Sequence, residues 1–162
     1  MWYHHRKPGD PHRRCISGPQ DIVLLVRLGI WLMLLPGLLK ALPLRSLLRL
    51  LTPRSGRANP CREQAEQRRR YTDALLRRLP YTNRCLLRTL VLFRLLRQAG
   101  WSVQFCVGIR YDTALPATGP IQGHAWLRYR GAVFLEPGGG APIAGYRQTF
   151  CYPADPPAGG SP

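Results

Sequence analysis

Acidic side chains are scarce in this chain. Its 162 residues include 8 Asp and Glu against 24 Lys and Arg, which gives a formal charge of +16. Internal repeats are absent, which excludes solenoids and propellers, and 16 prolines with 16 glycines argue against one long bundle or coiled coil. An apolar content of 45% excludes a wholly disordered chain. The length therefore predicts one ordinary domain with at most a small appendage.

Paired cysteine motifs are also missing. None of the five cysteines forms a CxxC pair, and a chain of this length does not need a disulfide framework. Reduced thiols in the cytoplasm are therefore the expected state. A zinc site stays open as an alternative, although the paired spacing of structural zinc ligands is lacking. Its ligands would be Cys85, Cys106, His124 and Cys151. We expect neither a metal nor an organic cofactor.

Long uncharged apolar segments are absent as well. The longest run covers residues 28–39 and has 12 residues, whereas a transmembrane helix needs about 18 or more. Residues 21–57 are nevertheless leucine-rich, with Asp21 as an N-cap, and Pro36 and Pro43 are expected to divide them into short helices. Buried core helices are the first interpretation. An interfacial amphipathic helix and a membrane span are the alternatives, and membrane contact is not favoured.

The flanking segments carry few structural signals. Residues 1–20 lack an apolar period and a signal-peptide cleavage site, which indicates a mobile basic arm. Breaker-rich residues 53–60 separate the Leu-rich region from a predicted basic helix over residues 61–79. This helix is a candidate docking surface for a partner. Residues 153–162 are predicted to be a disordered tail.

Helix and strand signals succeed one another after residue 80. A helix is predicted over residues 84–98, capped by Thr82 or Asn83 and ended by Gly100. After it we predict, in order, a strand over 101–111, a loop over 113–123, a β-hairpin over 124–137 and mostly irregular chain beyond residue 142. The fold class is therefore α+β, with a small antiparallel sheet preceded by Leu-rich helices.

Cys85 lies in the first turn of the predicted helix. Free N–H groups and the helix dipole favour an anion there, and Arg84 and Arg88 add positive charge. These conditions lower the pKa of a thiol and make the thiolate available. The alternative interpretation is a small buried side chain beneath a helix cap.

His124 opens the predicted hairpin just after Gly123. An imidazole on a strand beside a thiolate would form the Cys–His pair of nucleophilic catalysis. Taken alone, His124 would more often be an ordinary core or surface histidine. The order of Cys85 and His124 along the chain matches that of papain-like and transglutaminase-like enzymes.

Glu136 joins Cys85 and His124 as a third candidate residue if the hairpin has the register that Gly131 favours. A three-residue loop over 129–131 places Gly131 in the left-handed conformation that such loops need. Glu136 then lies directly opposite His124, with Cβ atoms about 5 Å apart. A two-residue loop would turn Glu136 to the other face. In the favoured register Glu136 can orient His124 as the acid of a triad does.

The residues around Cys85 and His124 resemble a known family. The segments YTNRCLLRTLVLFRLLRQAGWSVQFCVGIRYD and QGHAWLRYRG are similar to the transglutaminase-like leader peptidases of lasso-peptide biosynthesis. The resemblance covers roughly residues 60–150 and implies a transglutaminase-like catalytic domain over residues 58–152. It implies Cys85 as nucleophile, His124 as base and Glu136 as acid. Asp is usual at the acid position, and Ala is common where this chain has Gly123.

The resemblance also implies an activity and its partners. The activity is cleavage of a bacterial precursor peptide between leader and core, after which a separate macrolactam synthetase closes the ring. Residues 1–80 show no strand alternation, so a fused winged-helix leader-recognition domain is not expected. A separate leader-recognition protein is implied in its place.

Two other functions remain open at this stage. The same thioester attacked by an amine would make the protein a transglutaminase or amide ligase. A chain this basic could also be a non-catalytic protein of membrane surfaces or nucleic acids. No nucleic-acid partner is expected, because the arginines are scattered and no aromatic-studded basic sheet is indicated.

Overall fold

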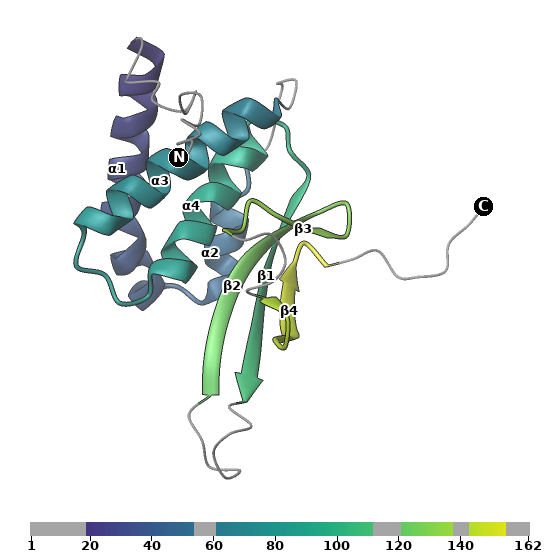
Figure 1. Cartoon of the computed structure of the whole chain (residues 1–162). Coiled ribbons are helices and arrows are strands. Elements are labelled where there is room, and N and C mark those ends of the chain that lie inside the picture. The colour runs from purple at the N-terminus through teal and green to yellow at the C-terminus, as the bar shows by residue number, and fades with distance from the viewer. Residues whose placement is uncertain (1–18, 54–60, 112–120, 138–142, 155–162) are drawn as a thin grey trace, which may run out of the picture.

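The computed structural model describes residues 19–53, 61–111, 121–137 and 143–154. These residues form helices followed by a small antiparallel sheet (Figure 1), so the α+β prediction is confirmed. In chain order the elements are α1 (Pro19–Ala41), α2 (Leu44–Leu51), α3 (Arg62–Arg78), α4 (Arg84–Gln98), β1 (Val103–Tyr111), β2 (Ile121–Tyr129), β3 (Ala132–Phe134) and β4 (Arg147–Tyr152). Most of the predicted basic arm and of the predicted tail lies outside the described residues. The predicted division at residues 57 and 58 stays a prediction.

Helix α1 continues through Pro36, which corrects the prediction of a break there. Proline cannot donate to the carbonyl four residues earlier, and that carbonyl belongs to Leu32. The hydroxyl of Tyr81 donates to the Leu32 oxygen at 3.1 Å instead. The predicted break at Pro43 is confirmed, because α1 ends at Ala41 and α2 begins at Leu44. Asp21 lies in the first turn of α1 and is not its N-cap.

Helix α1 is apolar on two opposite faces. Leu28, Leu32 and Leu35 are fully buried against the protein, as the core-helix interpretation requires. The other face leaves large apolar side chains more than half exposed, among them Val26 and Ile30. By length and composition alone, Asp21–Ala41 could also cross a bilayer. The core-helix prediction therefore holds for one face only.

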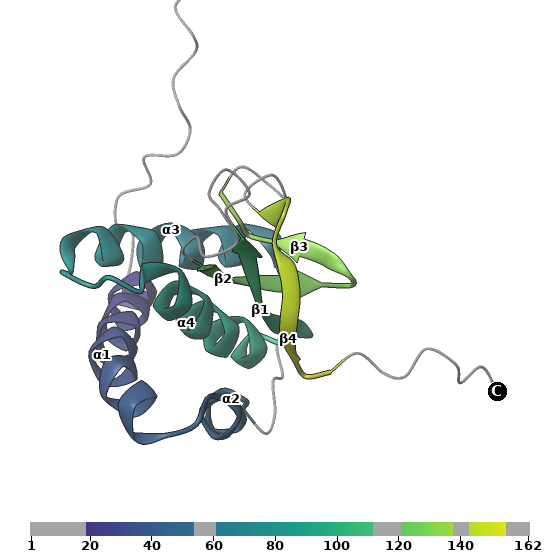
Figure 2. The same cartoon turned by 90° about the horizontal axis from the view of Figure 1, so that it is seen from below.

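Helix α4 has the predicted bounds and lies between α1 and the sheet (Figure 2). Asn83 is its N-cap residue, and the chain leaves it through Gly100, whose φ is 84°. The Trp101 N–H donates to the Leu96 oxygen, which closes a Schellman motif. Eight of its residues are buried, so α4 is the centre of the core.

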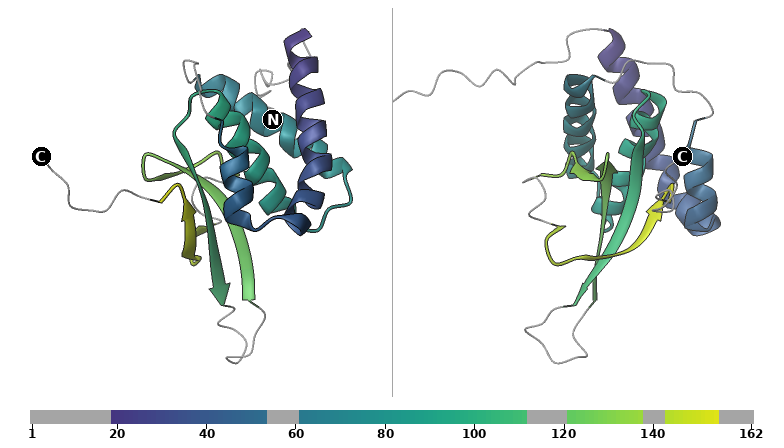
Figure 3. Two further views of the ribbon diagram at one scale, coloured as in Figure 1. Left: turned by 180° about the vertical axis from the view of Figure 1, so that it is seen from behind. Right: turned by 90° about the vertical axis from the view of Figure 1, so that its right-hand side faces the viewer.

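The sheet has the strand order β3-β2-β1-β4, and all its pairings are antiparallel (Figure 3). Strand β2 begins at Ile121, three residues before the predicted start of the hairpin. Strand β4 corrects the prediction of mostly irregular chain after residue 142. It pairs with the free edge of β1, from Phe105 opposite Tyr152 to Ile109 opposite Arg147. Because β4 is short and follows a glycine-rich segment, the sequence pattern does not predict it.

The hairpin between β2 and β3 differs from the prediction by one residue. Tyr129 pairs with Ala132, so the turn consists of Arg130 and Gly131, whose φ angles are 50° and 78°. Two positive φ angles are typical of a type I′ turn, which matches the twist of the strands. The predicted three-residue loop was wrong, and Glu136 is not a ladder partner of His124.

Candidate functional site

The N-terminus of α4 presents Cys85 to β2. Cys85 is the second residue of the helix and is half-buried. The His124 imidazole lowers the pKa of the Cys85 thiol, and hydrogen bonds from the backbone of Ala125 and Leu86 act in the same direction against burial. The thiolate is therefore favoured at this position.

The imidazole of His124 lies between Cys85, Glu136 and two aromatic rings. It stacks on Trp126 with ring centroids 6.2 Å apart, and the ring of Tyr146 lies 5.5 Å away. Cys85 first and Glu136 second raise the pKa of His124 to about 9, against the effect of burial. A raised pKa of His124 and a lowered pKa of Cys85 together favour a thiolate–imidazolium pair at neutral pH.

Glu136 reaches His124 by a route that strand register does not predict. Strand β3 ends at Phe134, and Leu135 has a φ of 60°, which turns the chain back toward His124. The Glu136 Oε2 atom lies 3.5 Å from Nε2 of His124, and the Glu136 side chain is 3% exposed. Because Nε2 faces Glu136, Nδ1 is the ring nitrogen available to Cys85. The structure thus brings together all three residues predicted from the sequence.

Arg88 fixes the Glu136 carboxylate from the other side. Its Nη1 donates to Glu136 Oε1 at 2.8 Å, its Nη2 to the Leu135 oxygen at 2.6 Å and its Nε to Asp73 at 2.7 Å. Burial raises the pKa of Glu136, but His124 and Arg88 outweigh it and the net pKa is lowered. Sequence reasoning treated Arg88 only as positive charge near Cys85. Its place one helical turn after Cys85 was the available signal.

Thr89 ties α4 to β2 beneath the site and was missed by sequence reasoning. It is 1% exposed, and its hydroxyl lies 2.8 Å from the Cys85 oxygen and 3.0 Å from the Ala125 oxygen. The hydroxyl can donate to either carbonyl. It therefore links the first turn of α4, which holds Cys85, to strand β2, which holds His124. The available signal was a polar residue on an otherwise apolar helix face.

Two cavities differ in their relation to these residues. One of about 270 Å³ includes Cys85 and Arg88 in its lining. A larger one of about 550 Å³ lies at the opposite end of α4, beside Leu95 and Gln98, and includes none of the three predicted residues. The smaller cavity is therefore the one relevant to chemistry at Cys85.

The alternative zinc site is not assembled. Cys106 on β1 and Cys151 on β4 are cross-strand partners with sulfur atoms 2.7 Å apart, while Cys85 interacts with His124. Burial raises the pKa of the Cys106 thiol. Among the described residues, no three His, Cys, Asp or Glu side chains come close enough to share a metal ion.

A nucleophile at a helix N-terminus, an imidazole on a strand and a buried carboxylate are the parts of a Cys–His–acid triad. A family model of the transglutaminase-like superfamily matches residues 30–151, which include all three side chains. No curated protein and no solved structure matches the chain.

Proposed function

Because the chain belongs to the transglutaminase-like superfamily, with its cysteine-peptidase and transglutaminase-type activities, we propose that it is a leader peptidase. Its substrate is a ribosomally made lasso-peptide precursor, and it cleaves between leader and core. The observation that carries this proposal is the contact of His124 with both Cys85 and Glu136. No cofactor takes part in the proposed chemistry.

The reaction begins with attack of the Cys85 thiolate on the scissile carbonyl carbon, which forms a C–S bond. The free backbone N–H of Cys85, at the start of α4, stabilises the oxyanion. His124 gives its proton to the leaving amine as the C–N bond breaks. Water then attacks the thioester while His124 accepts its proton, which releases the leader acid and restores the thiolate.

The partners follow from the same proposal. A separate leader-recognition protein presents the precursor in the cytoplasm, and a macrolactam synthetase receives the free core.

The test is incubation of the full chain with a leader–core precursor and a leader-binding protein, followed by mass spectrometry. Two products whose masses add up to the mass of the precursor plus one water are expected, and none with Cys85→Ala. Adding a primary amine such as glycine methyl ester separates hydrolysis from ligation. Amidated leader in place of leader acid would show a ligase, and intact precursor under all conditions would contradict the proposal.

A further inference from the structure

The cavity beside Cys85 is small and lined by arginine. Helix α3 contributes Asp73, Leu76 and Arg77 to it, and α4 contributes Arg84, Cys85 and Arg88. Its volume of about 270 Å³ is below the range of about 300–1,000 Å³ that is typical of sites for whole small molecules. A single side chain of a bound peptide is therefore the occupant that fits.

The carboxylate of Asp73 does not neutralise the whole cavity. One of its oxygens accepts from Arg88 at 2.7 Å, and the other accepts from Arg69 at 3.0 Å. Arg88 also donates to Glu136 and to the oxygen of Leu135, so all three of its nitrogens are engaged. Both oxygens of Asp73 are thus already engaged by arginines, one by Arg88 and the other by Arg69.

Arg77 and Arg84 have no carboxylate partner among the described residues. The described acceptors of the Arg84 side chain are the backbone oxygens of Tyr81 at 3.0 Å and Leu79 at 3.4 Å, and these acceptors are neutral. Arg77 is exposed, and its side chain makes no hydrogen bond or ion pair with another described residue. Two guanidinium groups that the described part of the chain leaves without a carboxylate therefore line the same cavity as the nucleophile, and guanidinium is the group best suited to a carboxylate fork.

We propose that this cavity is a subsite for an acidic side chain, Asp or Glu, on the substrate residue whose carbonyl Cys85 attacks. The proposal rests on the function proposed above. Leu76 and Pro137 supply apolar wall for the methylene groups of that side chain, while Arg77 and Arg84 meet its carboxylate.

The test uses two peptide electrophiles that differ only in charge, the chloromethyl ketones of acetyl-Ala-Ala-Glu and acetyl-Ala-Ala-Gln. The Cys85 thiolate displaces chloride and forms a thioether, and its rate of labelling is followed by mass spectrometry with Cys61 as internal reference. In the unaltered chain we expect the Glu probe to label Cys85 about fivefold faster than the Gln probe, the size of an exposed ion pair.

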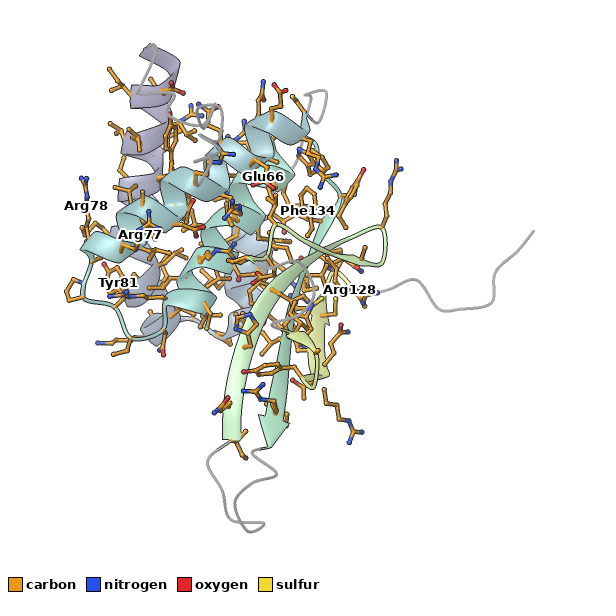
Figure 4. The ribbon with its side chains drawn as sticks, in the orientation of Figure 1. Glu66, Arg77, Arg78, Tyr81, Arg128 and Phe134 are labelled. Carbon is orange, nitrogen blue, oxygen red and sulfur yellow. The ribbon has the colours of Figure 1, made fainter. Side chains whose placement is uncertain are left out.

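Variants of neighbouring arginines separate local from general charge effects. Arg77→Glu and Arg84→Glu should each abolish or invert the preference for the Glu probe. The matched control is Arg78→Glu, which changes the net charge equally at the same end of α3 (Figure 4). Arg78 is not among the residues that line the cavity. This variant should preserve the preference. Because Arg84→Glu also removes hydrogen bonds, the labelling rates of the unaltered chain are also measured in 10 mM and in 1 M KCl. The preference for the Glu probe should be present in 10 mM KCl and should be lost in 1 M KCl, where salt screens the charges.

The outcomes distinguish the two proposals. If Cys85 is labelled faster than Cys61 but equally by both probes, the acidic subsite is wrong and the peptidase proposal stands. If neither probe labels Cys85 faster than Cys61, the peptidase proposal fails and the subsite fails with it.

Discussion

At the scale of single residues, the site depends on a buried guanidinium that lies outside the triad. Arg88 is 11% exposed and Glu136 is 3% exposed, so their 2.8 Å ion pair is shielded from water. Removing one partner of a buried pair leaves an uncompensated charge, which costs far more than losing an exposed pair. The pair also holds the Glu136 carboxylate beside His124. Arg88 is therefore a positioning residue.

Replacing Arg88 with Gln should lower the free energy of unfolding by about 3 kcal/mol. It should also raise the pKa of Glu136, because Arg88 is one of the groups that lower it. Glu136 then becomes protonated at a higher pH and no longer supports the His124 imidazolium. Urea unfolding measures the first effect, and the rate of Cys85 alkylation at pH 5 to 6 measures the second.

Arg69→Gln is the matched control for Arg88→Gln. Like Arg88, Arg69 pairs with Asp73, and it also pairs with Glu66. These ion pairs are more exposed than that of Arg88, because the side chains of Arg69 and Glu66 are 24% and 33% exposed. The loss of Arg69 should cost about 1 kcal/mol or less and leave Cys85 alkylation unchanged. Equal effects of the two substitutions would show that Arg88 has no special role.

At the scale of elements, Gly108 allows β1, β2 and β4 to approach one another at the site. It pairs with His124 across β1 and β2. A Cβ atom at this position would lie 2.7 Å from the Arg147 oxygen on β4 and 2.7 Å from the Trp126 ring, which stacks on His124. One of these neighbours must move if residue 108 has a side chain.

Gly108→Ala should therefore destabilise the protein by about 1–3 kcal/mol and slow the alkylation of Cys85. Gly123→Ala is the matched control. Gly123 pairs with Ile109 in the same ladder, beside His124, and a Cβ there meets nothing within 4 Å. Thermal unfolding and alkylation rates of both variants give the comparison. A Gly108→Ala protein as stable and reactive as Gly123→Ala would contradict the close approach of β4 and Trp126.

Elements with strong local signals were predictable from the sequence. The leucine period between Asn83 and Gly100 gave the bounds of α4, and β-branched and aromatic residues gave β1. The hairpin register was not predictable from the sequence. Arg130 and Gly131 both have a positive φ, which allows a two-residue turn, whereas the prediction assigned a positive φ to Gly131 alone. Strand β4 was missed because an edge strand depends on a distant partner rather than on its own pattern.

The structure brings the three predicted site residues together, but by a geometry that differs from the predicted one. Cys85 and His124 meet because of the predicted helix and strand. Glu136 reaches His124 through the left-handed turn at Leu135, a non-glycine residue for which sequence gives no such signal. Arg88 and Thr89 act through long-range contacts, with Leu135, Glu136 and Ala125 as partners, and these contacts are visible only in the folded chain.

At the scale of the whole molecule, α1 belongs to the same core as the sheet. Leu32 on its inner face is fully buried, whereas Ile30 on its outer face is 51% exposed. Leu32→Ala should lower the free energy of unfolding by about 2–5 kcal/mol, and Ile30→Ala should change it by about 0.5 kcal/mol or less. Urea unfolding of both variants is the measurement. Equal effects would show that α1 does not pack on the rest of the protein.

The central claim is that Cys85 and His124 form a thiolate–imidazolium pair, and the pH dependence of Cys85 alkylation tests it most directly. Iodoacetamide labelling from pH 5 to 10 is mapped by mass spectrometry, with Cys61 as reference. Because the pKa of Cys85 is lowered and that of His124 is raised to about 9, Cys85 should react fast below pH 7. Its rate should stay nearly constant until His124 loses its proton near pH 9.

The decisive comparison is with His124→Ala. Without the imidazolium, the Cys85 rate should rise only toward the ordinary thiol pKa of about 8.5 or above, and the reactivity below pH 7 should be lost. If Cys85 in the unaltered chain reacts no faster than Cys61 below pH 7, or if His124→Ala leaves its profile unchanged, the ion pair does not exist and the account is contradicted.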